Sequence, residues 1–356
     1  MNEIDEKAYK NARRDYMDVA RGICMISIVL GHLSDVFVNK FVFTFHLPVF
    51  FIITGYFFKP DESLLVLIKK RIRGLIIPYF FSCLCILMSW FLVNHLFLKT
   101  AHDDIKYGLI RWIKASICAT GDSYDVPFKI PSIGAIWFLW ALFWGCIIFS
   151  ILVKVSPIKR SLIIVGLFVL ARWTVQNICF IPLSIQPACS AVLFIYIGYL
   201  WKTNEDFIKS ASHSVKVFAL IIAVILWYEF VKSFQSFWLV HSDFGRGFSD
   251  VIASICASFL VIYISYLLEK RLHRFLAPIR MLGRYSIIAL CAHIIELNAF
   301  PWGKILTDIL GENPEWVRSV WLKIVFKLIW IFLFTYAFSK LKITRRIFNI
   351  RIESHG

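Results

Sequence analysis

About ten long apolar segments follow one another along the chain, and they constrain its fold more than any other feature. A helix needs about 20 apolar residues to cross the hydrocarbon core of a bilayer. Lipid offers no partners for free backbone groups, and none of the segments alternates with the period of two typical of barrel strands. The sequence therefore predicts an all-α, polytopic integral membrane helix bundle of about ten transmembrane helices. The predicted spans cover residues 18–38, 41–58, 75–98, 134–153, 161–178, 187–201, 215–235, 248–268, 285–302 and 321–339.

The composition fits this class and excludes several others. Of the 356 residues, 59% are hydrophobic and 17% are charged, against about 45–50% and about 25% in soluble domains. A secreted disulfide scaffold and a disordered chain are excluded. The net charge of +16 belongs to loops that flank apolar helices, so nucleic acid is not an expected partner. The nine cysteines form neither a CxxC pair nor a Cys/His ligand set, and the sequence predicts no metal site.

The basic residues are distributed unevenly between the two sides of the membrane. Most of the 39 lysines and arginines fall in the N-terminal tail, every second loop and the C-terminal tail. The positive-inside rule then places both termini, the tails 1–17 and 340–356, in the cytoplasm. The longest loop, about 99–133, would face outward and is too short for a separate catalytic domain. Residues 1–356 are thus expected to form a single transmembrane domain, with any chemistry held by the helix bundle.

Titratable residues in the first span are the strongest functional signal, because burying them in lipid is costly. Arg21 and His32 are separated by eleven positions, about 20° past three full turns, so they share one helix face about 16 Å apart. Asp35 shares the face as well and could orient the imidazole of His32; the alternative is that it marks the outer helix end. For His32 the alternative is a structural bond to a carbonyl, and for Arg21 it is snorkelling beside Asp18.

The second span carries another histidine at a similar depth. His46 lies opposite His32 across the predicted hairpin, and two histidines at one level are a more specific signal than either alone. Pro48 removes a backbone donor and can open a pocket beside His46. A structural histidine pair is the alternative. His293 and Glu296 share a face of a later span and are weaker candidates to line an outer cavity.

The loop after the second span is strongly basic. It reads KKRIRGLIIPY over residues 69–79, with Lys70, Arg71 and Arg73 directly before a predicted helix start. Such a cluster can bind phosphates through its side chains and the positive end of the helix dipole. An ordinary positive-inside stop signal is the alternative, but Arg21 is expected at the same membrane face.

In order along the chain, these motifs resemble acyltransferase family 3 of bacterial membrane O-acyltransferases, especially its fucose 4-O-acetylase-like branch. The resemblance covers nearly the whole chain. The first motif pair is specific, whereas the later motifs are too apolar to stand alone. The matching segments are RGICMISIVLGH (21–32), FHLPVFFIITGYFF (45–58), KKRIRGLIIPY (69–79), IWFLWALF (136–143), AVLFIYIGYLWK (191–202) and LGRYSIIALCAH (282–293).

The resemblance implies a ten- or eleven-helix enzyme of the inner (cytoplasmic) membrane. It would move an acyl group, usually acetyl, from cytoplasmic acetyl-CoA to a hydroxyl of a cell-surface or lipid-linked glycan. His32 would be the catalytic histidine and Arg21 its partner on the donor side. Lys70 and Arg73 stand where many members have two arginines, and lysine there lacks the bidentate fork of arginine.

The residues alone leave two other functions open. A transporter or flippase of a lipid-linked sugar could use the buried histidines as a proton relay, although no inverted repeat is visible. A passive scaffold for envelope assembly would need neither Arg21 nor His32. The expected partners of the enzyme are acyl-CoA, an envelope glycan or lipid-linked sugar, and membrane lipid, with a homodimer left open. The expected residues are His32, Asp35 and His46 for catalysis and Arg21, Lys70, Arg71 and Arg73 for the donor.

Overall fold

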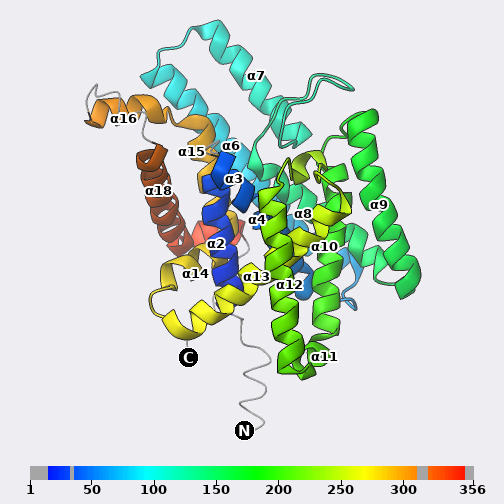
Figure 1. Cartoon of the computed structure of the whole chain (residues 1–356). Helices are drawn as coiled ribbons and strands as arrows, with labels where there is room; N and C mark the ends of the chain where they lie inside the picture. The colour runs from blue at the N-terminus through cyan, green and yellow to red at the C-terminus, as the bar shows by residue number, and fades with distance from the viewer. Residues whose placement is uncertain (1–14, 33–35, 311–319, 349–356) are drawn as a thin grey trace.

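The computed structural model describes residues 15–32, 36–310 and 320–348, and the regular elements in these ranges are helices (Figure 1). The long helices are α2 (Asp15–Gly31), α6 (Ile77–Leu92), α7 (His102–Cys118), α8 (Phe138–Leu152), α9 (Pro157–Asn177), α10 (Ile185–Thr203), α12 (His213–Lys232), α13 (Phe248–Leu272), α15 (Ser286–Ala299) and α18 (Val320–Lys340). The shorter elements are α3 (Val36–Val42), α4 (His46–Tyr56), α5 (Leu64–Arg71), η1 (Ile72–Ile76), η2 (Val93–Phe97), η3 (Ala135–Trp137), α11 (Glu205–Ser210), η4 (Leu239–His241), α14 (Ala277–Arg284), α16 (Trp302–Leu310) and α19 (Lys342–Ile347).

Each predicted span overlaps described helices, but the turn predicted between the first two spans at residues 39–40 lies within α3, and residues 33–35 lie outside the described residues. Fewer of these helices are long and apolar enough to cross a bilayer alone. Six described helices meet that condition, and a seventh span results if the bent pair α14–α15 is counted as one. The helices α2, α9 and α10, which were predicted as spans, are not among these six. Because α10 packs against α4, α8 and α9, protein replaces much of the lipid around it. The number of spans and the side of each terminus stay predictions.

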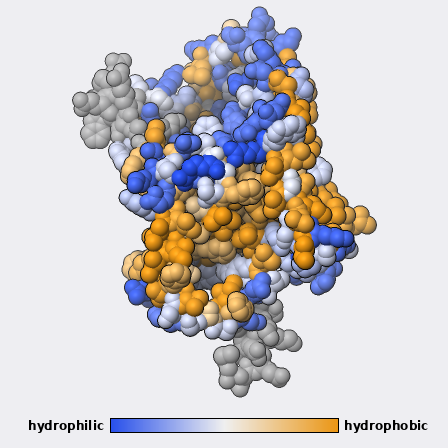
Figure 2. All heavy atoms as spheres, turned by 45° about the vertical axis from the view of Figure 1, so that its right-hand side comes forward, coloured by the Kyte–Doolittle hydropathy of each residue, from blue (hydrophilic) through white to orange (hydrophobic). Residues whose placement is uncertain are grey.

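The surface has the polarity pattern of a multi-pass membrane protein. In Figure 2 apolar residues form a band across the middle of the visible face, with hydrophilic residues above it and along the lower rim. The helix α12 is typical of this band, since only 6% of its most apolar window is buried inside the protein. A helix that is apolar on its outer face needs lipid around it.

The bundle has two ends that matter for the site. The end with α11 and α14 lies at the bottom of Figure 1 and is called the basic end below, after the cations near it. The opposite end, with α7 and α16, is called the loop end. The helix α2 runs from the basic end toward the loop end (Figure 1) and therefore connects them.

Close packing of α14 fixes the first half of α2. A Cβ atom added at Gly283 would lie 1.6 Å from the backbone oxygen of Asp18, and one added at Gly22 would lie 2.0 Å from that of Ile279. Only glycine therefore permits this approach of the two backbones. The contact brings Arg284, the last residue of α14, beside the first turns of α2.

A break between α3 and α4 places His46 at the start of a helix. Pro48 has no backbone N–H, so the carbonyl of Thr44 lacks its helical donor. The hydroxyl of Ser254 on α13 donates to that carbonyl at 2.6 Å instead, and the indole of Trp227 donates to the Thr44 hydroxyl at 2.9 Å. The expected effect of Pro48 thus takes the form of a helix break that two neighbouring helices stabilise.

Proline also explains the π-helical turn η1 after α5. Pro78 cannot donate to the carbonyl four residues before it, and the pattern shifts to a wider turn in which Ile77 N–H bonds to the oxygen of Ile72. Turns of this type often occur at functional sites. Here the turn carries Arg73 and lies next to Arg71.

Two regions differ from the sequence expectation in detail. The loop predicted over 99–133 contains the helix α7 before its turns, because polar residues such as Asp103 and Asp104 in its first turn suit the helix dipole. The predicted span 285–302 is a helix of 14 residues bent by 84° from α14. Its length of about 21 Å is less than the hydrocarbon thickness of about 30 Å.

Candidate active site

One large cavity connects the basic end with the loop end. Its volume is about 1670 Å³, whereas single small-molecule sites measure about 300–1,000 Å³. One face of α2 lines it with residues spaced at helical intervals, namely Arg21, Met25, Ile28 and His32. Arg21 and His32 thus line the same cavity, as expected from their spacing, and the unbroken helix keeps them about 16 Å apart along its axis.

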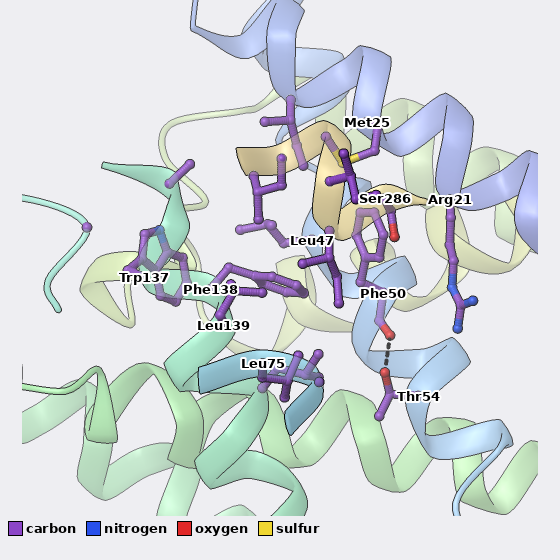
Figure 3. Close-up of a pocket in the computed structure, with 18 of the residues that line it drawn as sticks. Arg21, Met25, Leu47, Phe50, Thr54, Leu75, Trp137, Phe138, Leu139 and Ser286 are labelled. Carbon is purple, nitrogen blue, oxygen red and sulfur yellow. Dashed lines mark hydrogen bonds between the residues drawn. The ribbon is translucent and has the colours of Figure 1, made fainter. Parts of the chain in front are cut away.

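The middle of the cavity is apolar. In Figure 3 the side chains of Met25, Leu47, Phe50 and Phe138 converge on a common space from α2, α4 and α8, with Arg21 on one side and the indole of Trp137 on the other. The hydroxyl of Thr54 donates to the carbonyl of Phe50 at 2.8 Å (Figure 3) and so adds no free polar group there. This zone suits a long, flexible ligand of low polarity.

His32 lies near the loop end of the cavity and is exposed to it. Its Nδ1 atom is 2.7 Å from the carbonyl oxygen of Ile28, one turn earlier. The same Nδ1 is 3.3 Å from Nε2 of His293, and the two rings meet edge to face with their centres 4.9 Å apart. The Nε2 atom of His32 is thereby the ring nitrogen left for a ligand.

His293 continues into a buried chain of polar groups. Its Nδ1 is 2.9 Å from Oε1 of Glu296, and the Nζ atom of Lys327 is 3.0 and 2.9 Å from the two carboxylate oxygens. The indole N–H of Trp302 donates to Oε2 of the same carboxylate. Glu296 and His293 are fully buried, and Lys327 is 6% exposed. We call His32, His293, Glu296 and Lys327 the histidine chain.

The contacts of the histidine chain fix the direction of its hydrogen bonds. The Glu296 carboxylate can only accept, so Nδ1 of His293 carries the proton and its Nε2 is an acceptor. That acceptor, together with the Ile28 carbonyl, requires the proton of neutral His32 on Nδ1. The lone pair of His32 Nε2 then faces the cavity, which is the state needed in a general base or a nucleophile.

The other two predicted catalytic residues are placed differently. His46 is buried and lines the same cavity, but its Nδ1 lies 2.5 Å from the carbonyl oxygen of Val42 and its ring packs on Phe43 at 5.1 Å. The imidazole in contact with His32 is therefore His293, from a helix far away in the sequence. Asp35 lies outside the described residues.

The basic end gathers cations from segments that are far apart in the sequence. Asp18 is buried and forms ion pairs with Arg21 at 3.5 Å and with Arg284 at 3.7 Å. A single carboxylate thus holds two guanidinium groups at the cavity wall. Around the same end the cavity is lined by Lys59, Lys69, Lys70, Arg71, Arg73, Lys340 and Arg345.

The predicted donor residues on α5 and η1 are not equivalent. Lys70 is about half exposed and pairs with Glu62 at 3.2 Å. Arg71 lines the cavity, and its Nε atom is buried with no hydrogen-bond partner among the residues that the structure describes. A buried donor of a charged group without a partner is costly, so it marks a place for an anion.

A comparison with protein-family models identifies the family. Residues 14–340 match the acyltransferase domain of acyltransferase family 3. The chain belongs to this family. No curated protein and no solved structure matches the chain. Family membership supports acyltransferase activity and a multi-pass membrane location, in agreement with the resemblance noted in the sequence.

Sequence reasoning missed part of this acyltransferase site. Lys327 belongs to the histidine chain, but it stands among apolar residues of α18 with no local motif; its position inside a predicted span was the available signal. Lys340 and Arg345 come from the end of the chain, and no spacing relates them to Arg71. His293 and Glu296 shared a face, which showed that they act together but not that they meet His32.

One group of side chains in the described part of the acyltransferase has the spacing of a metal site. Asp15, Glu269 and His273 offer ligand atoms within 4.8 Å of one another. However, the guanidinium group of Arg280 contacts both Glu269 and His273, and so it already supplies the positive charge. None of the three residues lines the cavity, although Asp15 pairs at 3.7 Å with Arg284, which does.

Proposed function

We propose that the protein is a membrane O-acyltransferase that moves an acyl group, acetyl in the first instance, from acyl-CoA to a hydroxyl of an envelope glycan or lipid-linked sugar. The observation that carries the proposal is the single cavity with a cationic end, an apolar middle and an accessible imidazole near the other end. The acyl donor would enter from the cytoplasm through the basic end, and the protein would reside in the inner membrane.

The basic end fits the phosphates of CoA. Arg21, Arg71 and Arg73 offer planar guanidinium groups suited to bidentate phosphate contacts, and the unpartnered Nε of Arg71 is a donor that such a phosphate would satisfy. Lys70 contributes charge, since Glu62 already binds its ammonium group. The pantetheine arm is linear and of low charge, which suits the apolar stretch between Arg21 and His32.

In the simplest route His32 is the general base. Its Nε2 takes the proton of the acceptor hydroxyl while the hydroxyl oxygen bonds to the thioester carbonyl carbon. The C–S bond then breaks, and the imidazolium returns the proton to the thiolate, so the products are an ester and the free thiol of CoA. In the other route Nε2 attacks the thioester carbonyl carbon, and the C–S bond breaks to release the CoA thiolate. The acceptor hydroxyl oxygen then takes the acyl group from Nε2, and the hydroxyl proton passes to the thiolate. Incubation of the protein with radiolabelled acetyl-CoA, followed by a rapid quench, separates the routes. Label that is retained on the wild-type protein and absent from His32→Ala indicates the covalent route.

The rest of the histidine chain would stabilise the positive charge that develops on His32. Nδ1–H of the imidazolium faces the lone pair of His293, whose other nitrogen donates to the Glu296 carboxylate. Lys327 neutralises the carboxylate in the resting state and so lowers the free-energy cost of burying it in the membrane. His293 and Glu296 would be positioning residues, while His46, which lines the same cavity, would contact the acceptor.

The function is tested with purified protein and a deletion strain. Acetyl-CoA with the wild-type protein should release free thiol and transfer label to envelope polysaccharide of the deletion strain, and mass spectrometry of those glycans should show an acetyl increment restored by the wild-type gene alone. His95→Ala is a suitable control, since this exposed histidine lies off the cavity. A different pair of results would indicate a flippase: the deletion strain no longer exports an unmodified glycan, and the purified protein releases no thiol from acetyl-CoA.

A further inference from the structure

The loop end of the cavity carries polar and aromatic side chains that the proposed chemistry does not use. Asp122, Trp238 and His241 line the same cavity as His32. They come from two loops, one between α7 and α8 and the other between α12 and α13. Trp238 is 46% exposed, and the side chain of Asp122 is 52% exposed. The ring of Trp238 packs on that of His241 at 5.5 Å between centres, and Nε2 of His241 lies 3.0 Å from the Asp122 carboxylate. A large exposed aromatic ring in such a polar group is typical of a binding surface rather than of a packed core.

Both loops are fixed in place by backbone bonds. Tyr124 and Ile130 form one antiparallel β-bridge, and Trp238 and Asp243 form another. Gly121 completes the fit, because a Cβ atom there would lie 2.2 Å from the ring of Trp137. The site is therefore held ready before a ligand binds, which reduces the entropy cost of binding.

A hydrogen-bonded series orients the Asp122 carboxylate. Burial and the nearby carboxylate raise the pKa of the Tyr124 hydroxyl, so this group keeps its proton. The hydroxyl lies 2.9 Å from Nδ1 of His241 and 3.3 Å from the carbonyl oxygen of Val240. Because the Asp122 carboxylate can only accept from Nε2 of His241, Nδ1 of the neutral ring accepts from this hydroxyl. The Nε2–H of His241 then donates to Oδ2 of Asp122 at 3.0 Å, and Ser123 N–H donates to Oδ1 at 2.7 Å. Each carboxylate oxygen keeps a lone pair for a ligand.

We propose that Asp122 and Trp238, with His241 as the residue that positions Asp122, form a binding subsite for an uncharged sugar ring of the acceptor. The indole of Trp238 offers a flat apolar surface for the C–H face of a pyranose. The two free lone pairs of Asp122 suit two adjacent hydroxyl donors. The carboxylate disfavours a uronic acid or a phosphate at this position. The inference rests on the proposed function, since it names the class of acceptor at its site.

Saturation-transfer NMR with the detergent-solubilised full chain tests the subsite without depending on activity. The probes are methyl glycosides of neutral hexopyranoses and the methyl glycoside of glucuronic acid. Wild type should bind the neutral glycosides more tightly than the uronoside. Asp122→Asn and Trp238→Ala should weaken binding of the neutral glycosides about tenfold or more, because each removes a charge-assisted or aromatic contact. Trp238→Phe should keep most of the binding.

Matched controls separate this role from general damage. Asp125→Asn changes an exposed aspartate on the same loop, and Trp173→Ala removes an exposed tryptophan of α9; neither lines the cavity, and both should bind like wild type. Equal binding by all variants, or no binding by wild type, would overturn the subsite. Thiol release from acetyl-CoA by wild type is measured in parallel. Its absence overturns the proposed function, while residue-dependent sugar binding would still support the subsite.

Discussion

At the basic end of the cavity, cationic side chains from α2, α5, η1, α14, α18 and α19 face one space, and several of them are exposed. At the loop end, the accessible imidazole of His32 is followed by three buried groups that bond to one another within 3.3 Å. The first arrangement tolerates the loss of an exposed member such as Lys70, because neighbouring charges overlap in their effect. The second depends on each member, because each group in it bonds to the next one. Donor binding at the basic end is thus shared among several side chains, whereas the chemistry at the loop end depends on each single one.

The largest effect is expected from His32→Ala. Loss of a general base or of the nucleophile lowers the turnover number by about 10²–10⁴, whereas the affinity for acetyl-CoA should change little because the cationic end is intact. Initial rates of thiol release over a range of acetyl-CoA concentrations measure both quantities, with His95→Ala as the control. Activity of His32→Ala within twofold of wild type would contradict the account of the loop end.

The buried pair of Glu296 and Lys327 is expected to affect stability as well as activity. Glu296→Gln leaves the Lys327 ammonium group buried without its carboxylate, which costs about 3–5 kcal/mol. The double variant Glu296→Gln, Lys327→Met removes both charges and should recover most of the thermal stability but not the activity, since the glutamine oxygen can accept from His293 but carries no negative charge to stabilise the imidazolium. Melting curves in detergent give the first quantity and thiol release gives the second. Full recovery of activity in the double variant would show that the pair is only structural.

Within the basic end, Arg71 should matter most. Its buried, unpartnered Nε is expected to bond to a phosphate, and a charge-assisted bond is worth about 1.5–3 kcal/mol. Arg71→Gln should therefore raise the KM for acetyl-CoA by about tenfold to a hundredfold with little change in kcat. Arg271→Gln removes an exposed cation of α13 that does not line the cavity and should leave KM unchanged. Equal KM values for the two variants would remove Arg71 from the donor site.

Lys70 should give the smallest effect. The group is half exposed and paired with Glu62, and exposed ion pairs contribute about 0.2–1 kcal/mol. Lys70→Gln is expected to raise the KM for acetyl-CoA less than fivefold, and the increase should shrink further at high salt because of screening. A larger effect than that of Arg71→Gln would reverse the ranking within the basic end.

The sequence predicted what local periodicity controls. The shared face of Arg21 and His32 follows from 3.6 residues per turn, and the apolar segments predicted the long helices of the bundle. The short helices α5, α14 and α19, which carry cations of the basic end, lie outside the predicted spans. The partner of His32 could not be found this way, because His293 lies 261 positions further along and the meeting depends on how α15 packs beside α2. His46 was expected at the depth of His32, and it lines the same cavity, but equal depth does not determine which ring contacts His32.

The cation cluster shows the same limit. Lys70, Arg71 and Arg73 were visible as a run of charge, but the run did not distinguish the buried Nε of Arg71 from the exposed ammonium group of Lys70. That difference arises from the π-helical turn that Pro78 causes and from the helices packed around it. Tertiary packing, rather than charge count, therefore determines which cation is suited to bind a phosphate.

The central claim is that one cavity carries an acyl group from the basic end to the loop end. Proteoliposomes with radiolabelled acetyl-CoA outside and a neutral methyl pyranoside trapped inside test it directly. The account predicts that wild-type molecules whose basic end faces outward transfer label to the trapped sugar, and that His32→Ala molecules in the same orientation transfer none. Label on the sugar only when donor and acceptor share one side of the membrane would contradict it.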